Sequence, residues 1–276
     1  STGATELTCS LTSINLSATG GDTYSWSNGS NIVGNNSSLV VNSPGTYTVT
    51  VAANSNGCTQ TSSIVITQNI QLPNITITPN PNTTELNCTT TSIDLSANGA
   101  VSYSWALGTT NLGSTNSLLV NAPGTYNVSG IGSNGCTASA TCTITQNLSP
   151  PNVVINNTPN TSELDCNTTT ITIQATGGVS YSWSNGSNVI GTNPSTTINS
   201  PGIYTVTVTG SNGCVATQST SITQDISLPT PAITNNSAIT ELTCVQTSIS
   251  LSASGGSSYT WANGSAAVGA LPSLSV

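Results

Sequence analysis

The 276-residue sequence contains no Lys, Arg, His, Met or Phe, and charged residues make up only 3% of it. Nucleic-acid binding relies on Lys and Arg to neutralise phosphates, so the missing cations exclude it, and they also exclude electrostatic attraction to an anionic membrane. Without Lys or His, no Schiff-base lysine, histidine general base or histidine metal site can form. No apolar run approaches the ~20 residues of a membrane span.

Acidic residues are almost as scarce, with eight in the whole chain and a net charge of −8. A glycosidase needs two carboxylates about 5–10 Å apart, and only Glu163 and Asp165 offer such a pair on one strand face. No other part of the chain repeats that pair. We therefore expect no enzymatic activity and no cofactor, and we interpret the net charge as aiding solubility.

The sequence is rich instead in Ser and Thr (93 together) and Asn (33), and it is built from repeats. The tetrapeptides ELTC, ELNC, ELDC and ELTC end at Cys9, Cys88, Cys166 and Cys244, in steps of 79, 78 and 78 residues. A Trp follows each of these cysteines by 17 residues. This regularity predicts four tandem domains, the last incomplete. Their expected bounds are 1–70, 71–148, 149–226 and 227–276.

Alternating side chains indicate β-structure in every repeat. In TYTVTV, Tyr47, Val49 and Val51 share one face and threonines the other, a period of two that is typical of a half-buried strand. The pair Asn56-Gly57 favours a hairpin turn. No window has a helical period, and turn signals recur every 8–12 residues. We predict an all-β fold of tandem Ig-like β-sandwich domains of about 78 residues, arranged as beads on a string with Pro-stiffened linkers.

The aromatic residues recur once per repeat, which is typical of core positions on strands. An exposed Trp that stacks on sugars is the alternative, and it keeps a carbohydrate-binding module open. The first repeat lacks the strand that residues 74–78 supply to the second, and the last lacks its two final strands, so we expect a window from a longer array. The expected core residues are Trp26, Trp105, Trp183, Trp261, Tyr47, Tyr126 and Tyr204.

Eight cysteines without CxxC spacing indicate disulfides formed in an oxidising compartment. The NGC hairpin is expected where the chain enters a domain, near the first cysteine of the same repeat, and a bridge needs Cα atoms within about 7 Å. We therefore favour pairing within each repeat, and the alternative pairing crosses each linker. The favoured pairs are Cys9–Cys58, Cys88–Cys136 and Cys166–Cys214, and the alternative pairs are Cys58–Cys88, Cys136–Cys166 and Cys214–Cys244.

Pairing within repeats leaves Cys142 and Cys244 over. The partner of Cys244 would lie in the final strands that the last repeat lacks. Cys142 is interpreted as a small buried apolar residue, with a cross-link to a neighbouring chain as the alternative. A calcium ion at the domain joints, held by Glu85, Asn69 and nearby carbonyls, is a further hypothesis because hard cations prefer oxygen ligands.

The motifs GG before YSW, the W-S-N-G turn, the PGTY strand and the NGC hairpin resemble the SprB-type repeat of Bacteroidetes cell-surface adhesins, which are linked to gliding motility. The resemblance covers residues 20–68, 98–146 and 177–224 and starts again at 255. It implies Ig-like or PKD-like domains, secretion to the cell surface and service in an adhesin stalk. Ser55 stands where the family usually has Asp.

These observations predict a non-enzymatic, extracellular structural repeat region of a cell-surface adhesin or filament, which gives reach, stiffness and attachment. A self-assembling surface fibre and a carbohydrate-binding module are the alternatives. The expected partners are neighbouring copies of the chain, other cell-surface components or surface glycans. We expect neither nucleic-acid binding nor membrane insertion.

Overall fold

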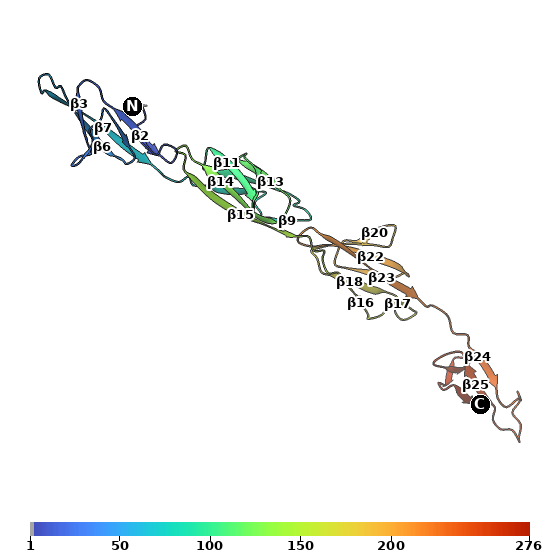
Figure 1. Cartoon of the computed structure of the whole chain (residues 1–276). Coiled ribbons are helices and arrows are strands. Elements are labelled where there is room, and N and C mark those ends of the chain that lie inside the picture. The colour runs from blue at the N-terminus through green and yellow to red at the C-terminus, as the bar shows by residue number, and fades with distance from the viewer. Residues whose placement is uncertain (1–2) are drawn as a thin grey trace. The chain divides into compact units, whose positions relative to one another are not determined.

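A computed structural model describes residues 3–276, and within that range the chain forms strands and turns with no helix. Accordingly, no described helix could cross a membrane. The chain divides into two compact units, Ser1–Pro151 with Thr209–Ala216, and Asn152–Val208 with Thr217–Val276. Figure 1 labels many of the strands. The predicted bounds of the four repeats stay a prediction.

The second repeat shows the full plan of a β-sandwich. A five-stranded sheet in the order β12-β11-β14-β15-β9 packs against a three-stranded sheet in the order β13-β10-β8. Core residues come from both sheets. The strands are β8 (Thr76–Asn80), β9 (Glu85–Asn87), β10 (Ile93–Asn98), β11 (Ser102–Leu107), β12 (Thr110–Gly113), β13 (Ser117–Val120), β14 (Gly124–Ile131) and β15 (Thr137–Asn147).

The alternation predicted from the sequence is confirmed in the long hairpin of each of the first three repeats. Along β14 the buried side chains Tyr126 and Val128 alternate with partly exposed ones. The strand pairs antiparallel with β15 over its whole length. The Asn-Gly turn between the two strands places Gly135 at a φ of 76°, in the left-handed region that favours glycine. The predicted turn at Gly57 in the first repeat has a φ of 69°.

The ELxC segment adds an edge strand that the alternation did not predict. In the second repeat β9 runs parallel to the last residues of β15, with Glu85 opposite Thr145 and Asn87 opposite Asn147. This position buries Leu86 in the core. The NGC turn, in contrast, lies at the first residue of β15.

The third repeat has the same two sheets, in the orders β17-β23-β22-β19-β20 and β16-β18-β21. Its edge strand β17 also runs parallel to the last residues of β23. Its strands are β16 (Val154–Thr158), β17 (Glu163–Leu164), β18 (Ile171–Thr176), β19 (Ser180–Ser184), β20 (Val189–Gly191), β21 (Ser195–Ile198), β22 (Gly202–Thr209) and β23 (Val215–Gln224).

The first repeat has the five-stranded sheet β1-β7-β6-β3-β4, but its second sheet contains only β2 and β5 within the described residues. The strand expected to be missing from the sequence is therefore missing from the fold, and one edge of β2 is unpaired. The strands are β1 (Glu6–Thr8), β2 (Ile14–Ser17), β3 (Thr23–Ser27), β4 (Ile32–Gly34), β5 (Ser38–Val41), β6 (Gly45–Ala52) and β7 (Thr59–Asn69).

The last residues, from 227 onward, form two small sheets, β24-β25-β28 and β26-β27. In this part the alternating apolar residues are more exposed than their equivalents in the complete repeats. The strands are β24 (Ala232–Asn235), β25 (Ser250–Ser254), β26 (Trp261–Asn263), β27 (Ala266–Gly269) and β28 (Ser273–Ser275).

Each of the first three repeats encloses its own cluster of buried residues around one Trp. The Trp105 indole Nε1 donates a hydrogen bond to the carbonyl of Thr115, ten residues later. The other three Trp residues each make the equivalent bond, so no indole N–H is buried without a partner. The structure buries all seven aromatic residues expected in the cores, Trp26, Trp105, Trp183, Trp261, Tyr47, Tyr126 and Tyr204.

Candidate functional site

Two disulfides join different repeats within the first compact unit. Cys9 bonds Cys136 and Cys88 bonds Cys214, with Cα–Cα distances of 4.9 and 5.0 Å. Each bridge links the ELxC cysteine of one repeat to the NGC cysteine of the next. The favoured pairing within repeats is therefore wrong for Cys9–Cys58, Cys88–Cys136 and Cys166–Cys214, and the alternative is wrong for Cys58–Cys88, Cys136–Cys166 and Cys214–Cys244.

The parallel edge strand is the physical reason for this correction. It carries the ELxC cysteine to the last residues of the final strand, whereas the NGC cysteine precedes the first residue of that strand. The final strand β15 has 11 residues, and at about 3.3 Å per residue its ends are roughly 35 Å apart. Two cysteines of one repeat thus lie far beyond the reach of a disulfide.

An asparagine side chain organises the first joint. The Asn134 amide Nδ2 donates to the carbonyl oxygen of Gln71 at 2.8 Å and to the side-chain and backbone oxygens of Asn69 at 3.0 and 3.3 Å. Its Oδ1 accepts the backbone N–H of Cys136, and its carbonyl accepts the N–H of Cys9. One residue therefore contacts the turn, the linker and the cysteine of the preceding repeat.

Asn212 repeats these contacts at the second joint. Its Nδ2 donates to the carbonyl of Ser149 at 2.9 Å and to the side-chain and backbone oxygens of Asn147 at 3.1 and 3.3 Å. Its carbonyl accepts the N–H of Cys88, and its Oδ1 accepts the N–H of Cys214. The joint is thus a recurring structure with the same donors and acceptors.

The glycine of each NGC turn allows the close approach. A Cβ atom on Gly135 would overlap Ser10 of the preceding repeat, and one on Gly213 would overlap Thr89. Both glycines also have a positive φ. In the first repeat, Gly57 has the same backbone conformation, but nothing lies within 4 Å of its Cβ position. Within residues 3–276, the turn of the first repeat therefore has no other repeat packed against it.

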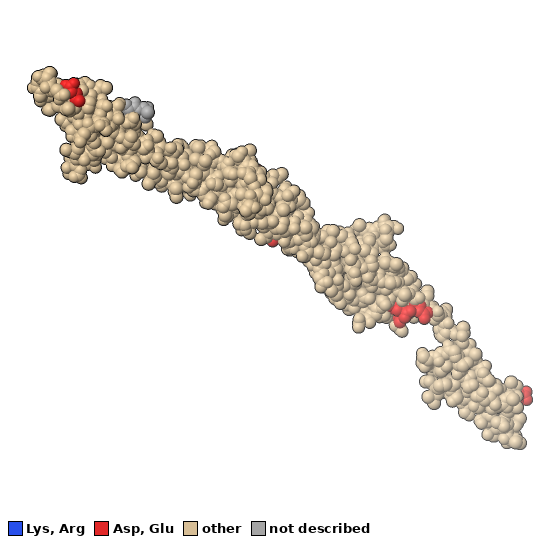
Figure 2. Space-filling model, viewed as in Figure 1, with Lys and Arg blue, Asp and Glu red and all other residues tan. Residues whose placement is uncertain are grey.

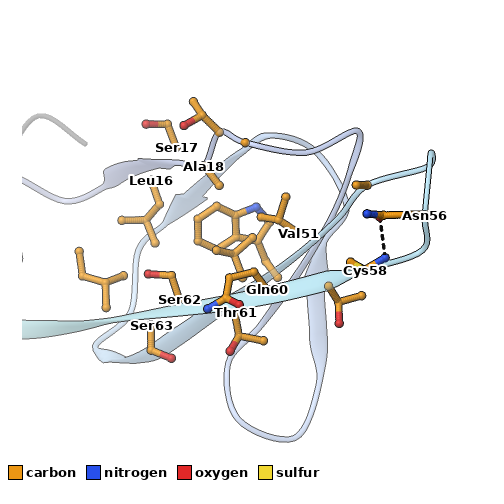
Figure 3. A pocket seen from close by; sticks show the side chains of 17 residues that line it. Leu16, Ser17, Ala18, Val51, Asn56, Cys58, Gln60, Thr61, Ser62 and Ser63 are labelled. Carbon is orange, nitrogen blue, oxygen red and sulfur yellow. Dashed lines mark hydrogen bonds between the residues drawn. The ribbon is translucent and has the colours of Figure 1, made fainter.

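The two residues of the first repeat that correspond to the joint residues Asn134 and Cys136, namely Asn56 and Cys58, are exposed as well. The Asn56 Oδ1 accepts the N–H of Cys58 at 3.0 Å, as at the two formed joints (Figure 3). Cys58 is exposed with a free thiol, whereas Cys136 and Cys214 are buried in their bridges. The Asn56–Cys58 turn thus has the same internal hydrogen bond as the turns at the two formed joints, but its cysteine forms no disulfide.

The remaining cysteines have free thiols. Cys166 and Cys244 are exposed. Cys142 is partly buried against the core of the second repeat, opposite Tyr126 on the neighbouring strand, and this burial raises the pKa of its thiol. Its surroundings match the interpretation of Cys142 as a small apolar residue.

A groove of about 720 Å³ lies along the open edge of the first repeat. Leu16 and Ala18 line one side, Val51 and Thr61 line another, and Asn56 and Cys58 lie at one end (Figure 3). In the second repeat, β8 pairs antiparallel with β10 at the equivalent edge, and Ile75 and Ile77 pack against the core. The groove therefore lies at the position that β8 occupies in the second repeat.

The acidic residues of the described part of the chain are spread along it rather than gathered in one place. Figure 2 shows few acidic atoms on the viewed face, and among the described residues no three His, Cys, Asp or Glu side chains gather in a position to hold an ion. At the first joint the Asn69 oxygens, which the calcium hypothesis used, accept hydrogen bonds from Asn134. An amide donor thus satisfies the oxygens there.

Asp165 is the acidic residue whose structural role is clearest. The backbone N–H groups of Thr168 and Asn167 donate to it and hold the pKa of its carboxyl below the ordinary value. Asn87 makes the same turn in the second repeat, where its Oδ1 accepts the N–H groups of Thr89 and Thr90.

Asp165→Asn is expected to reduce the acid sensitivity of the third repeat. A lowered pKa in the folded state gives stability that is present above the unfolded value of about 3.9 and is lost as the pH falls through the folded pKa. The Asn variant keeps the turn, as Asn87 shows, but has no proton to bind. Amide exchange of the third repeat at pH 6 and pH 3 measures this, and equal acid losses in both proteins would contradict it.

The aromatic side chains of the described residues are mostly enclosed by their own repeats. Each of the Trp and Tyr residues in the described part of the chain is buried or half-buried, and none is exposed. Tyr103 is one of the half-buried residues, and its hydroxyl accepts the backbone N–H of Ala100 and donates to the carbonyl of the same residue. The four Trp rings, on which the carbohydrate-binding alternative relied, are buried in the cores.

Of the six cysteines predicted to form disulfides, Cys9, Cys88, Cys136 and Cys214 do so, whereas Cys58 and Cys166 have free thiols, and the joint itself was not predicted. The two pairings considered and the observed one all fit the repeat spacing, so the spacing alone could not choose among them. The asparagine of NGC was identified only as a turn residue. The Leu that lies two residues before each ELxC cysteine was a usable signal for the edge strand. A Leu that recurs in a segment with no alternation suggests a short strand with one buried side chain.

No family model and no curated protein matches the chain. Among solved structures the chain is similar to murine CEACAM1b, with 12% identity, a TM-score of 0.28, and coverage of 55% of this chain and 100% of that one. It is also similar to the fibronectin(III)-like modules of Clostridium thermocellum CbhA, with 13% identity, a TM-score of 0.30, and coverage of 55% of this chain and 95% of that one. A third similar structure is extracellular domains 3–5 of Drosophila OTK, with 13% identity, a TM-score of 0.30, and coverage of 77% of this chain and 91% of that one. These values add nothing about ligand or activity. The chain is an all-β protein of tandem Ig-like β-sandwich domains.

Proposed function

We propose that the chain is a non-enzymatic structural repeat region of an extracellular protein, a cell-surface adhesin or filament, and that it gives reach, stiffness and attachment. The cross-repeat disulfides carry this proposal. Disulfides persist in oxidising compartments outside the cytosol, which supports an extracellular location. The resemblance to SprB-type repeats supports a position at the cell surface.

The two disulfides overlap along the sequence, because Cys88 lies inside the loop that Cys9–Cys136 closes. A pull on the chain ends therefore meets two covalent routes between Cys9 and Cys214. One route crosses the first bridge and follows the chain from Cys136, and the other follows the chain to Cys88 and crosses the second bridge. Each route contains only about 80 of the roughly 200 residues between the two ends. Such a chain resists extension even when its domains unfold.

The surface supports the same role. It has no cationic side chains to attract nucleic acid or phosphate, and few acidic ones, so little charge repulsion opposes contact with neighbouring copies. Single-molecule pulling of the oxidised and the reduced chain tests the mechanical role. If the oxidised chain released as much length as the reduced chain, the proposal would be overturned.

A further inference from the structure

We propose that the free edge of β15, in the second repeat, is a lateral contact for a second copy of this chain, which pairs its own β15 there in antiparallel orientation. This goes beyond the proposed structural role, which concerns connections within one chain and is tested separately by pulling. The second repeat has both of its sheets, and the sequence continues into a further repeat on either side of it. The edge is therefore a property of a complete repeat.

Most of β15 has a neighbouring strand on only one side. Its residues 137–144 pair with β14, but on the other side β9 covers only Thr145–Asn147 within the described residues. The Thr145 N–H donates to the carbonyl of Thr84 on that side, and backbone groups alternate in direction along a strand. Every second residue before Thr145 therefore directs its N–H and C=O groups to the free edge. These residues are Thr137, Ser139, Thr141 and Thr143.

Nothing in this segment blocks pairing with another strand. Natural sheet edges are usually protected by charged side chains, by Pro, by bulges or by being very short. Residues 137–143 contain neither charge nor Pro, and they pair with β14 without a bulge. The opposite edge of the same sheet differs, because β12 has only 4 residues and its pairing with β11 contains a bulge next to Trp105. The β15 edge is therefore the edge of this sheet that can accept a strand.

A second copy fits this edge because the segment is complementary to itself. In antiparallel pairing about a two-fold axis at Ser139, Thr137 of one copy faces Thr141 of the other, and Ser139 faces its counterpart. All three residues direct backbone groups outward, so each facing pair exchanges hydrogen bonds. The position of β9 sets this register, because Glu85 lies beside Thr145 and a partner strand must end before it. The rest of the free segment leaves room for the turn that precedes the partner's strand.

The side chains at this contact match those that already pair inside the sheet. Thr137, Ser139 and Thr141 are exposed. They lie on the same face of β15 as Thr143, whose hydroxyl lies 3.0 Å from that of Thr125 on β14 in a hydrogen bond. A second copy continues this row of hydroxyl pairs, and no like charges face each other across the axis. Equivalent hydroxyl pairs in the other repeats are Thr48 with Ser63, at 2.7 Å, and Thr205 with Ser219, at 2.8 Å.

The contact is weak for a single repeat. Pairing over one short strand buries less than the roughly 1,000 Å² of a stable interface, so we expect reversible association that needs a high concentration of chain. The third repeat has the same open segment, because β17 covers only Thr223 and Gln224 at the end of β23. A lateral contact of this kind is thus available more than once along the chain.

The first test places charges at the two-fold axis and follows the mass of the full chain by light scattering over a concentration series. All chains carry Ser at the three exposed thiols, so that chance disulfides between copies do not contribute. We expect the mass to rise toward that of two copies as the concentration increases. Ser139→Lys or Ser139→Glu alone sets like charges opposite each other and should abolish this rise, whereas a 1:1 mixture should restore it. The background substitutions are Cys58→Ser, Cys166→Ser and Cys244→Ser.

Thr125→Lys is the matched control. Thr125 is exposed on the same face of the sheet, but it lies on β14, one strand inside the edge. This variant should associate like the chain without it. Recovery of association in the mixture of the two Ser139 variants would also show that both of them fold.

A disulfide trap tests the direction of the two strands. Thr137→Cys in one chain should face Thr141→Cys in another, with Cα atoms about 5.5 Å apart, within the range of a disulfide. In a 1:1 mixture oxidised by glutathione disulfide, mass spectrometry of linked peptides should find position 137 bonded to position 141. Parallel pairing or random collision would instead join each position to itself. The proposal is wrong if those self-bonds dominate, if the mass stays that of one copy at every concentration, if either Ser139 variant associates alone, or if their mixture does not associate.

Discussion

When single molecules of the oxidised chain are pulled to full extension, the distance between Cys9 and Cys214 is expected to stop at the length of about 80 residues, roughly 280 Å at 3.5 Å per residue. The reduced chain should extend over about 205 residues, on the order of 700 Å. The difference arises because each covalent route between these cysteines contains one disulfide and only part of the backbone.

A variant that removes one bridge separates this account from pairing within repeats. In Cys9→Ser with Cys136→Ser, the Cys88–Cys214 bridge remains, and the stretch from residue 9 to Cys88 still limits the extension to about 80 residues. The overlapping bridges are thus redundant under load. Pairing within repeats would leave only Cys166–Cys214 intact in this variant, and the extension would rise to roughly 155 residues. An extension of that size would contradict the account.

Trp105→Ala is expected to lower the free energy of unfolding of the second repeat by about 3–5 kcal/mol, the usual cost of truncating a buried Trp. Trp105 has no exposed surface, belongs to the core cluster of the second repeat and donates a hydrogen bond to the carbonyl of Thr115. The variant leaves a cavity and an unpaired carbonyl. Amide hydrogen exchange followed by peptide mass measures this repeat by repeat, and protection of Tyr126 and Val128 should fall.

Trp261→Ala is the matched control, because Trp261 makes the equivalent hydrogen bond to Leu271 but is 8% exposed in the smaller last part of the chain. A smaller cost is expected there because fewer core contacts are lost. Equal costs at the two sites, or an unchanged exchange rate in the second repeat after Trp105→Ala, would show that the single Trp is not the centre of each core.

Local patterns predicted much of the fold. The alternation around Tyr47 and the Asn56-Gly57 turn depend only on neighbouring residues, so the sequence of one repeat is enough to predict this strand and this turn. The missing strand of the first repeat was also visible, because the second repeat supplies a template at residues 74–78. The observed strand begins two residues later, at Thr76, and extends to Asn80.

The joint could not be predicted in the same way, because it depends on which end of a domain each cysteine occupies. That choice is made by the parallel pairing of β9 with the end of β15, a contact between residues about 60 positions apart in the chain. No alternation or turn signal in the sequence specifies it. The asparagine contacts of the joint likewise require the folded linker, since Asn134 meets Asn69 only when two repeats are in place.

Mass spectrometry of the unreduced protein tests the central claim, the covalent connection between successive repeats, most directly. Trypsin cannot cut a chain without Lys or Arg, so pepsin is used, because it is active under the acidic conditions that slow thiol exchange. The account predicts a peptide with Cys9 linked to one with Cys136, and a peptide with Cys88 linked to one with Cys214, and fragmentation should assign the first bond to Cys136 rather than Cys142. Recovery of Cys9 linked to Cys58, or of Cys88 linked to Cys136, would contradict it.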